Sequence, residues 1–386
     1  MNDQYKKGTY GYDVAFFRHN SIPVVELKDE GSAAAVMIVP DFQGRVITST
    51  AGGLQGSSFG WINYDLIASG EINDHFNPYG GEERLWLGPE GGPFSIYFKP
   101  GAAQDFDGWK VPALIDTEPF ELVEQSAQHV RFTRDARLTN ASGTALSLRI
   151  ERKVSILPRK GSEEALGLSV DPNLSMVAYE SENKLFNTGT TAWNEQTGVL
   201  SIWMLSMFNP SEDGVVVIPF NTGAEGALGP VVNDDYFGKV PADRLLRHDG
   251  VLFFKTDGKH RSKIGLSPMR AQSWCGSYDP VQNVLTLLWY SLPENPERYV
   301  NSKWGPQDDP LNGDALNSYN DGPLEDGSVM GPFYEIESSS PAAFLSPGAS
   351  ITHTQRIFHI TGREQALDNI TTSLFGLTTE EIKNAF

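Results

Sequence analysis

The residues best suited to chemistry lie in one stretch, residues 76–98, which reads FNPYGGEERLWLGPEGGPFSIYF. It places Glu82 and Glu83 beside Arg84, and Trp86 follows two positions later. If this segment is extended, Arg84 and Trp86 share one face of the strand. A guanidinium donates to hydroxyl or carboxylate oxygens and an indole stacks on the C–H face of a sugar ring, so the pattern favours a sugar site. The alternative is a surface strand with a Glu–Arg pair and turn glycines.

A second group of candidates lies near this stretch and late in the chain. His75 titrates near neutral pH and can therefore move a proton. In residues 331–340, GPFYEIESSS, an expected strand turns Phe333, Glu335 and Glu337 to one side. A carboxylate beside a phenylalanine on a buried or concave face has a raised pKa, which suits a general acid or base. The equally weighted alternative is a solvent-facing glutamate on a half-exposed strand.

Two connecting segments, residues 54–93 and 294–330, are longer than a β-sandwich requires. Long ordered loops in compact domains are usually functional, so we expect the site there. A third polar and aromatic loop, residues 232–245, contains Lys239 and Arg244, which are suited to an anionic sugar. The favoured alternative for this third loop is a solvated surface segment.

The second long loop is also rich in oxygen donors. They are Asn317, Asn320, Asp321, Glu325 and Asp326. Ca²⁺ takes such ligands, but their spacing does not match the EF-hand pattern. The sequence therefore favours a solvated acidic loop, and no metal or other cofactor is expected.

The histidines and the cysteine carry weaker signals. His353 and His359 have the same parity on an expected strand, but satisfied strand histidines are commoner than metal ligands, and no pair has a metal-type spacing. Cys275 is the only cysteine, which excludes an intrachain disulfide. A buried thiol at the edge of a strand is favoured over a nucleophile there.

Composition narrows the class of protein. The chain has 386 residues with 30 Lys+Arg against 49 Asp+Glu, a formal charge of −19, and such a surface repels nucleic acid. No apolar run reaches the roughly 18 residues of a membrane-spanning helix. The N-terminus lacks the pattern of a signal peptide, which fits a cytoplasmic protein. A mature domain written without its leader fits equally, and then a periplasmic or secreted location is favoured.

Short β-patterned runs dominate the chain, whereas helical periodicity is convincing only near its end. The expected strands cover residues 33–40, 45–50, 94–100, 120–125, 129–139, 146–157, 198–208, 214–220, 250–257, 263–268, 283–293, 331–340 and 351–360. The turn sequences DFQG and NASGTA predict two hairpins, and TTEEIKNAF carries a helix capping box. The pattern predicts an all-β fold, a large antiparallel β-sandwich. We expect one domain over 1–386, with a helical tail at about 362–386.

No G-x-S-x-G elbow, P-loop, H-E-x-x-H or Rossmann glycine motif is present. Instead, NPYGGEERLWLGPEGGPFSIYF, VNDDYFGKVPADRL, NSYNDGP and FYEIESSSPAAFLSPGASITHTQRIFHI together resemble an uncharacterised bacterial family within the galactose mutarotase-like superfamily. The likeness covers roughly residues 10–360. The GGEERLWLGPE block is specific to that family, whereas the closing strands are similar to aldose 1-epimerase-like domains in general.

The resemblance implies a large antiparallel β-supersandwich whose concave face binds sugars. Epimerases of this superfamily open an aldose ring with a carboxylate base and a histidine acid, and an arginine and a second histidine hold the substrate. Carried over by position, Arg84 and His75 fit the holding roles and Glu335 fits the base.

The sequence departs from the superfamily pattern at the acid. Residues 160–240 contain no histidine, and His248 and His260 lie outside any matching motif. This departure puts mutarotase activity itself in question, and the superfamily also contains lyases and glucan-binding domains.

The leading hypothesis is a carbohydrate-active protein that binds a sugar in a cleft between the two long loops. Proton transfer at the anomeric centre, as in aldose 1-epimerases, is the expected chemistry. The alternatives are a non-catalytic glycan-binding protein and a polysaccharide lyase or glycoside hydrolase. The candidate catalytic residues are Glu335, Glu83 and His75. The candidate substrate contacts are Arg84, Glu82, Trp86, Tyr319, Asn320, Asp321 and Lys239.

Overall fold

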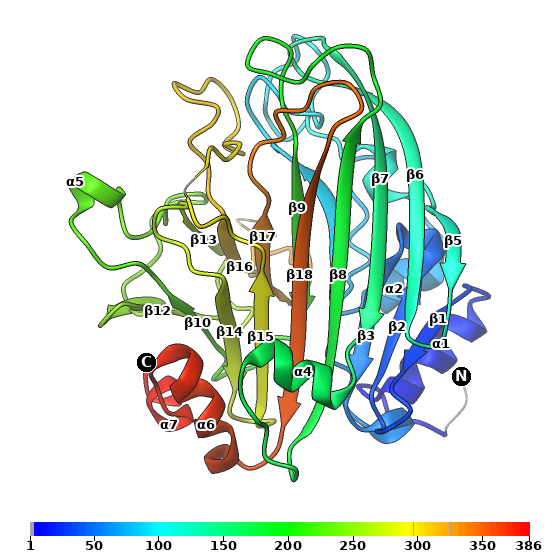
Figure 1. Cartoon of the computed structure of the whole chain (residues 1–386), viewed down its shortest axis with the longest axis vertical. Coiled ribbons are helices and arrows are strands. Elements are labelled where there is room, and N and C mark those ends of the chain that lie inside the picture. Colours follow the sequence, from blue (N-terminus) through cyan, green and yellow to red (C-terminus); the bar gives the residue numbers. More distant parts are fainter. Residues whose placement is uncertain (1–3, 296, 325) are drawn as a thin grey trace.

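The computed structural model describes residues 4–295, 297–324 and 326–386. Within them, the strands form three antiparallel sheets (Figure 1). The large sheet has ten strands, in the order β11 Leu245–His248, β12 Val251–Lys255, β10 Val215–Pro219, β14 Trp274–Asp279, β15 Val284–Tyr290, β18 Ser350–Thr361, β8 Ser175–Asn187, β7 Ala145–Ile156, β6 His129–Thr139 and β5 Glu121–Gln125.

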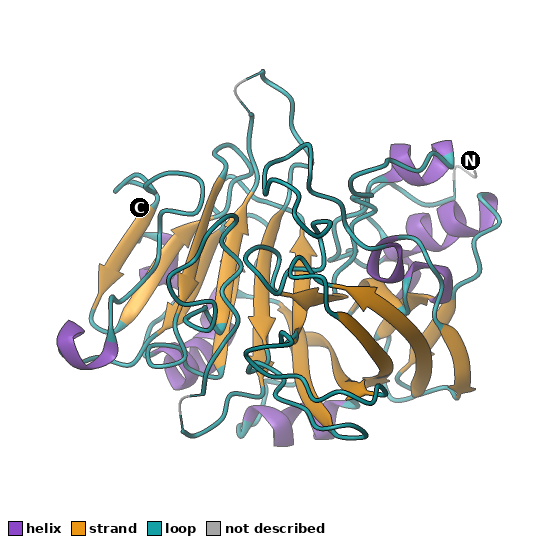
Figure 2. Ribbon diagram, turned by 90° about the horizontal axis from the view of Figure 1, so that it is seen from above, coloured by secondary structure: helices purple, strands orange, loops and turns teal. Residues whose placement is uncertain are grey.

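Two smaller sheets form the second layer. The middle sheet has five strands, in the order β13 Ser262–Leu266, β16 Leu316–Asn320, β17 Tyr334–Ser339, β9 Ser201–Phe208 and β4 Arg84–Gly88. The N-terminal sheet contains β1 Val25–Lys28, β2 Ala35–Val39 and β3 Arg45–Thr50. A bridge between Val46 and Glu83 joins the edge of the N-terminal sheet to the segment that enters β4. The second layer is therefore continuous across both sheets, and Figure 2 shows the layered strands from above.

The main hydrophobic core lies between the large sheet and the second layer. Val154 of β7, Leu185 of β8, Leu87 of β4 and Ile336 of β17 belong to one buried cluster. Alternation along the strands produces this packing, because residues two positions apart point to the same face. Burial of this apolar surface is the main favourable contribution to folding.

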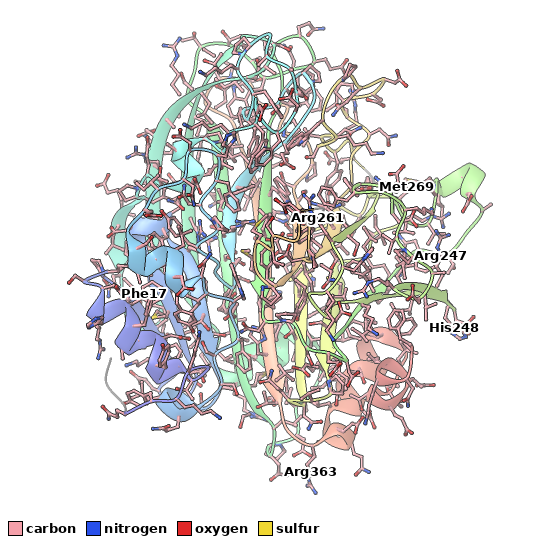
Figure 3. All side chains as sticks on the ribbon, turned by 180° about the vertical axis from the view of Figure 1, so that it is seen from behind. Phe17, Arg247, His248, Arg261, Met269 and Arg363 are labelled. Carbon is pink, nitrogen blue, oxygen red and sulfur yellow. The ribbon has the colours of Figure 1, made fainter. Side chains whose placement is uncertain are left out.

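Helices pack on the N-terminal sheet and on the outer side of the large sheet. The helices are α1 Tyr10–His19, α2 Tyr64–Ser69, α3 Ala113–Asp116, α4 Arg159–Leu166, α5 Glu225–Leu228, α6 Glu364–Phe375 and α7 Thr379–Lys383, with 3₁₀ turns η1 Pro40–Phe42 and η2 Gly53–Gln55. Phe17 of α1 is fully buried against the N-terminal sheet (Figure 3). Leu367 and Phe375 of α6 pack on the outer side of the large sheet. Among the described residues, no helix is long and apolar enough to cross a membrane.

The expected β-sandwich is confirmed, and both predicted hairpins form as β2–β3 and β6–β7. The predicted capping box is also present at α7, where Thr378 and Glu381 satisfy each other's backbone N–H groups. The strand predicted at residues 94–100 is wrong. Its apolar side chains, such as Phe94 and Phe98, are buried in the core from an irregular segment, so burial rather than strand pairing explains the run.

Sequence patterns missed the helix α1 and the long strand β8. The apolar residues of α1 include adjacent Phe16 and Phe17, and the helix shows little amphipathic contrast. On β8, the inward positions Ser181 and Asn183 are buried yet polar, so the strand lacks the expected apolar alternation. Both polar side chains belong to a hydrogen-bonded network inside the sandwich that is described below.

Candidate functional site

The candidate site lies on the outer face of the middle sheet, the face turned away from the large sheet. Two contacts identify the opposite face as the one that packs on the large sheet. Ser338 of β17 hydrogen bonds to His353 of β18, and Ser206 of β9 accepts from Gln355 of β18. Because side chains alternate along a strand, Glu335 and Glu337 of β17 must point the other way. The paired strands bring Arg84 and Trp86 of β4, Trp203 of β9, Asn317 and Tyr319 of β16, and Lys263 of β13 to the same face.

Arg84 and Glu335 meet at the centre of this face. An Arg84 Nη2–Glu335 Oε1 hydrogen bond of 2.9 Å joins two side chains that are 5% and 7% exposed. The guanidinium also lies 4.3 Å from the ring centroid of Trp86. Burial raises the pKa of Glu335 above its ordinary value, Arg84 lowers it, and Glu337 raises it again. A carboxylate with a raised pKa can exchange protons closer to neutral pH.

A second ion pair lies beside the first. Lys263 Nζ donates to Glu337 Oε2 at 2.8 Å, and Trp203 Nε1 donates to the same oxygen at 2.9 Å. The Lys263 ammonium also lies 5.1 Å from the centroid of Trp203. Burial by itself lowers the pKa of Lys263, but the neighbouring carboxylates of Glu337, Glu90 and Glu335 raise it overall. Lys263 is therefore held as a cation between these acids.

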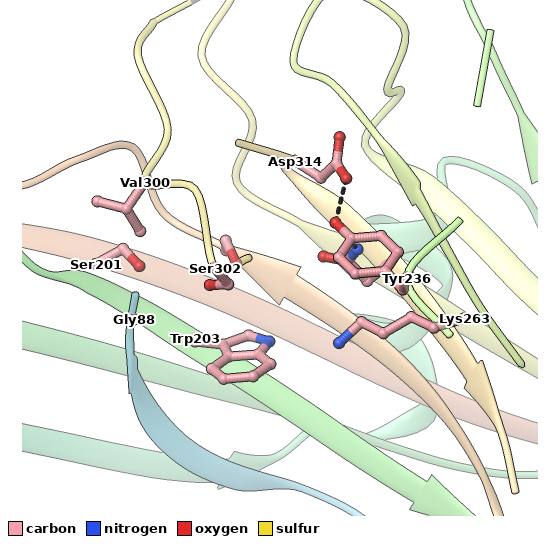
Figure 4. A pocket seen from close by; sticks show the side chains of 10 residues that line it. Gly88, Ser201, Trp203, Tyr236, Lys263, Val300, Ser302 and Asp314 are labelled. Carbon is pink, nitrogen blue, oxygen red and sulfur yellow. Dashed lines mark hydrogen bonds between the residues drawn. The ribbon is translucent and has the colours of Figure 1, made fainter. Parts of the chain in front are cut away.

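A small cavity opens beside Lys263 (Figure 4). It encloses about 20 Å³, roughly the space of one water molecule. Tyr236 lies on its wall and its hydroxyl donates to Asp314 Oδ2 at 2.5 Å, while Asn317 Nδ2 donates to the Tyr236 oxygen at 3.1 Å. Ser302, from the long loop, also lines the cavity. Loops thus cover the outer face at this point.

Several buried polar atoms on this face have no hydrogen-bond partner among the residues that the structure describes. They are Arg84 Nε and Nη1, Trp86 Nε1, Ser201 Oγ and Glu337 Oε1. Buried polar groups in native proteins are usually satisfied, and each unsatisfied one carries a free-energy cost of about 1–3 kcal/mol. Donors and an acceptor gathered beside two indoles match the edge of a polyhydroxylated ring.

Glu82 and Glu83 do not share this face with Arg84. Glu83 accepts from Arg152 Nη2 at 2.6 Å, and both side chains are fully buried between the sheets. Glu82 faces His359 Nε2 at 2.8 Å and accepts from Ser49 at 2.8 Å. The expectation that these glutamates line one cleft with Arg84 is corrected here, because Glu83 points to the other side of the chain and Glu82 turns inward before β4 begins.

The network around Glu83 extends through the interior. Ser181 Oγ donates to Glu83 Oε2 at 3.0 Å, and Gln355 Nε2 donates to the same oxygen at 2.8 Å. Arg152 Nη1 donates to Asn183 at 2.7 Å. These contacts satisfy the Glu83 carboxylate inside the sandwich. They also fix the backbone just before β4, where Arg84 turns to the outer face.

His75 and Lys239 lie at the margins of the site. His75 Nδ1 is 2.6 Å from the Trp109 carbonyl oxygen, and its ring stacks on Phe106. Lys239 donates to Asp234 at 2.6 Å with a side chain that is 73% exposed. No contact in the described structure joins either residue to Glu335.

The three candidate residues from the second loop, Tyr319, Asn320 and Asp321, do not all face the same side of the sheet. Tyr319 lies on the outer face and its hydroxyl donates to Asp321 at 2.9 Å. Asp321 also accepts from the Gly331 N–H. Asn320 points to the opposite side and holds the backbone of Gly258 and His260. Of this set, Tyr319 alone shares the outer face with Glu335 by strand pairing.

The calcium question concerns the same loop. Glu325 lies outside the described residues, and Asp326 accepts from its neighbour Ser328 in an exposed turn. Across the described parts of the chain, no three His, Cys, Asp or Glu side chains gather as a metal ion would require.

His353, His248 and Cys275 lie away from the Arg84–Glu335 pair. His353 lies between Ser338 and Ser291, and burial lowers its pKa to about 3. His248 lies on β11, the edge strand of the large sheet (Figure 3). Cys275 is buried in β14, as expected, and burial raises the pKa of its thiol.

Sequence reasoning missed four residues of this face: Lys263, Trp203, Tyr236 and Asp314. Lys263 and Trp203 lie within runs that predicted strands correctly, but a lone charge or indole in such a run carries no local signal. Asp314 lies in the long segment 294–330, and Tyr236 lies in the third loop, residues 232–245, for which a solvated surface segment was favoured. Their pairing across 78 residues has no counterpart in the sequence pattern.

Comparison with known proteins places the chain in a family. The chain belongs to DUF6786, a family of unknown function, whose model matches residues 8–386. No curated protein matches the sequence. The Slr1438 protein from Synechocystis has a similar structure at a TM-score of 0.53 and 14% identity, covering 89% of this chain and 96% of that one. This similarity shows a shared fold.

Two further structures are similar at lower scores. A galactose mutarotase-like protein from Lactobacillus casei is 11% identical at a TM-score of 0.48, covering 87% of this chain and 100% of that one. The GalM/aldose epimerase homologue from C. elegans is 10% identical at a TM-score of 0.46, covering 88% and 100%.

Proposed function

We propose that this DUF6786 chain binds a sugar on the outer face of the middle sheet and transfers a proton at the anomeric centre. The observation that carries the proposal is the buried Arg84–Glu335 pair beside Trp86, with unpartnered donors and an acceptor around it. Sugars present hydroxyl groups at their edge and C–H groups on their face, and this surface offers partners for both.

In this proposal Glu335 accepts the proton of the anomeric hydroxyl. Burial raises its pKa, so that it can exchange a proton near neutral pH, while Arg84 holds the carboxylate in one orientation. Two nitrogens of Arg84, Nε and Nη1, have no partner among the described residues and can donate to sugar oxygens. Trp86 supplies an aromatic surface, and Glu337, fixed by Lys263 and Trp203, offers one oxygen as an acceptor.

A second candidate function is sugar binding without catalysis. The observation that favours it is the ion pair itself, because Arg84 lowers the pKa of Glu335 and opposes the effect of burial. A permanently paired carboxylate would orient a sugar but not exchange protons with it.

The test measures anomer interconversion of D-galactose and D-glucose by NMR, together with binding by line broadening. We expect Glu335→Gln to lower the interconversion rate about 10²–10⁴-fold while sugar binding is retained. Glu121→Gln, on the exposed strand β5, is the matched control and should match the wild type. Binding with no interconversion by the wild type would support the non-catalytic candidate, and no binding of either sugar would contradict the proposal.

The same assay on oligosaccharides distinguishes the remaining alternative. A polysaccharide lyase or hydrolase would release unsaturated or reducing ends from them. Such products, with no effect on free anomers, would replace proton transfer at the anomeric centre as the conclusion.

A further inference from the structure

Ring opening needs an acid as well as a base, because the ring oxygen must gain a proton as the anomeric hydroxyl loses one. Among the described residues, those that line the cavity beside Lys263 include no histidine. They do include Tyr236 and Asp314, whose side chains are hydrogen bonded to each other (Figure 4).

We propose that Tyr236 is the acid of this reaction and that Asp314 returns its proton, so that the two form a relay on the cavity wall. The inference rests on the proposed function and deepens it. It assigns a catalytic role to a tyrosine and an aspartate in a chain that has no histidine between residues 160 and 240.

The hydrogen bonds around the Tyr236 oxygen allow it to donate into the cavity. Asn317 Nδ2 donates to this oxygen at 3.1 Å, and its own amide is held by the Ile264 carbonyl on β13. When Asp314 carries a proton, it donates to the same oxygen across the 2.5 Å contact. Both lone pairs of the hydroxyl are then occupied, and its hydrogen is free to point at a ligand.

Burial favours the protonated form of Asp314, whereas the nearby Lys263 and Lys303 cations lower its pKa and oppose this effect. Burial raises the pKa of this carboxyl group, although Tyr236 and Asn233 lower it by hydrogen bonding. Burial also raises the pKa of Tyr236, so a tyrosinate left alone would be costly. Proton return from Asp314 avoids that state, and the Lys263 ammonium lies 5.5 Å from the Tyr236 ring centroid, where it stabilises transient negative charge.

The step balances in atoms and charge. Glu335 takes the proton of the anomeric hydroxyl, the C1–O1 bond becomes a carbonyl, and the bond between C1 and the ring oxygen breaks with its electron pair moving to that oxygen. The ring oxygen takes a proton from Tyr236, which takes one from Asp314. After rotation about the C1–C2 bond, the reverse transfers close the ring and restore Glu335 and Asp314.

The test compares Tyr236→Phe, Asp314→Asn and the double variant in D-galactose interconversion. We expect each single variant to lower kcat about 10²–10⁴-fold with KM changed less than about threefold. Because residues that act as a unit are not additive, the double variant should be no slower than the slower single variant. Tyr64→Phe is the matched control, since Tyr64 donates to buried Asp13 at 2.6 Å beside the N-terminal helix.

Each other outcome overturns the relay. An active wild type with Tyr236→Phe within threefold of it would remove Tyr236 from the mechanism while leaving the proposed function intact. Multiplying losses in the double variant would show that Asp314 acts independently of Tyr236. A wild type that binds D-galactose but leaves its anomers unchanged would overturn both the relay and the proposed proton transfer.

Discussion

At the scale of single residues, two adjacent positions at the entrance to β4 have opposite surroundings. Arg84 faces outward and keeps free donors, whereas Glu83 faces inward and has all its contacts satisfied. A buried ion pair is expensive to break, because the partner that remains is a charge without compensation. The charges of the GGEERLWLG stretch therefore divide into an outward-facing arginine, to which we assign the proposed sugar contact, and an inward-facing glutamate that braces the interior.

Removal of Arg152 tests the bracing part. Arg152→Leu leaves the Glu83 carboxylate buried without its cation, and we expect a loss of roughly 3–5 kcal/mol in the free energy of unfolding. The double variant Glu83→Leu/Arg152→Leu should be more stable than Arg152→Leu, because it leaves no unpaired charge. Urea unfolding of both proteins measures the difference, and equal stability of the two would show that Glu83 is compensated by other groups.

His353 predicts a pH dependence of stability. Its pKa is lowered from 6.5 to about 3 in the folded protein by burial, so the unfolded chain binds the proton more readily. Stability due to this group is therefore retained above pH 6.5 and lost as the pH falls towards 3. Between pH 6.5 and pH 4.5 we expect a loss of roughly 2 kcal/mol from this residue.

The measurement compares urea unfolding of the wild type and His353→Gln at both pH values. Glutamine keeps a donor and an acceptor for Ser338 and Ser291 but does not titrate. The variant should lose roughly 2 kcal/mol less than the wild type on acidification. An identical loss in both proteins would assign the acid sensitivity to other groups.

At the scale of elements, sequence patterns located many of the strands that have an apolar face, although they missed β1, with buried Val25 and Leu27, and β14. β3 and β6 have the predicted bounds, because apolar positions alternate or run continuously there. β8 escaped because its inward side chains are polar, and the segment at residues 94–100 misled because irregular backbone can also be buried. A local sequence pattern indicates which side chains are buried. Whether a buried segment is also a strand depends on its pairing with other strands, which the local pattern does not contain.

The candidate site also depends on contacts between residues that are far apart in the sequence. Its central pair, Arg84 and Glu335, was named from composition and the family resemblance, and the fold brings together side chains that are 251 residues apart. The inward direction of Glu82 and Glu83 depends on a bridge between residues 46 and 83, which is not visible in either segment alone. Contacts made by tertiary structure therefore decide which of several neighbouring charges meets a ligand.

One glycine of β13 has a consequence for the site. A Cβ atom at Gly265 would lie 2.0 Å from Asp314 Oδ2 and 2.6 Å from Asn317 Nδ2. Gly265→Ala should therefore displace both side chains from Tyr236 and lower the interconversion rate about as much as Asp314→Asn. The melting temperature serves as the folding control, and a folded Gly265→Ala protein with wild-type activity would contradict this position for Asp314.

At the scale of the whole molecule, the site is covered. The enclosed volume of about 20 Å³ is far below the roughly 300–1,000 Å³ of typical ligand pockets. The segment 229–244, which carries Tyr236, is held by the exposed Lys303–Asp235 pair, by the Asn233–Gly265 backbone hydrogen bonds and by buried Val232 and Val240. The exposed pair contributes only about 0–1 kcal/mol. The segment lies outside the named strands, so its backbone makes fewer ladder hydrogen bonds than β13 or β16.

Hydrogen exchange tests whether this segment moves. We expect amides in segment 229–244 to exchange faster than those of β13 and β16, and D-galactose to slow them as the segment closes over the bound sugar. Exchange on α6, which lies on the far side of the large sheet, is the internal control. Sugar binding with no change in this segment would mean that the ligand enters by another route.

The buried cysteine makes such movements accessible to spectroscopy. Cys275 lies at 0% exposure, and burial raises the pKa of its thiol, so maleimide reagents should leave it unmodified in the folded protein. A cysteine introduced at Phe237, which is 47% exposed on the covering segment, would then take a single fluorophore or spin label. The native chain thus serves as its own unreactive background for recording when the site opens.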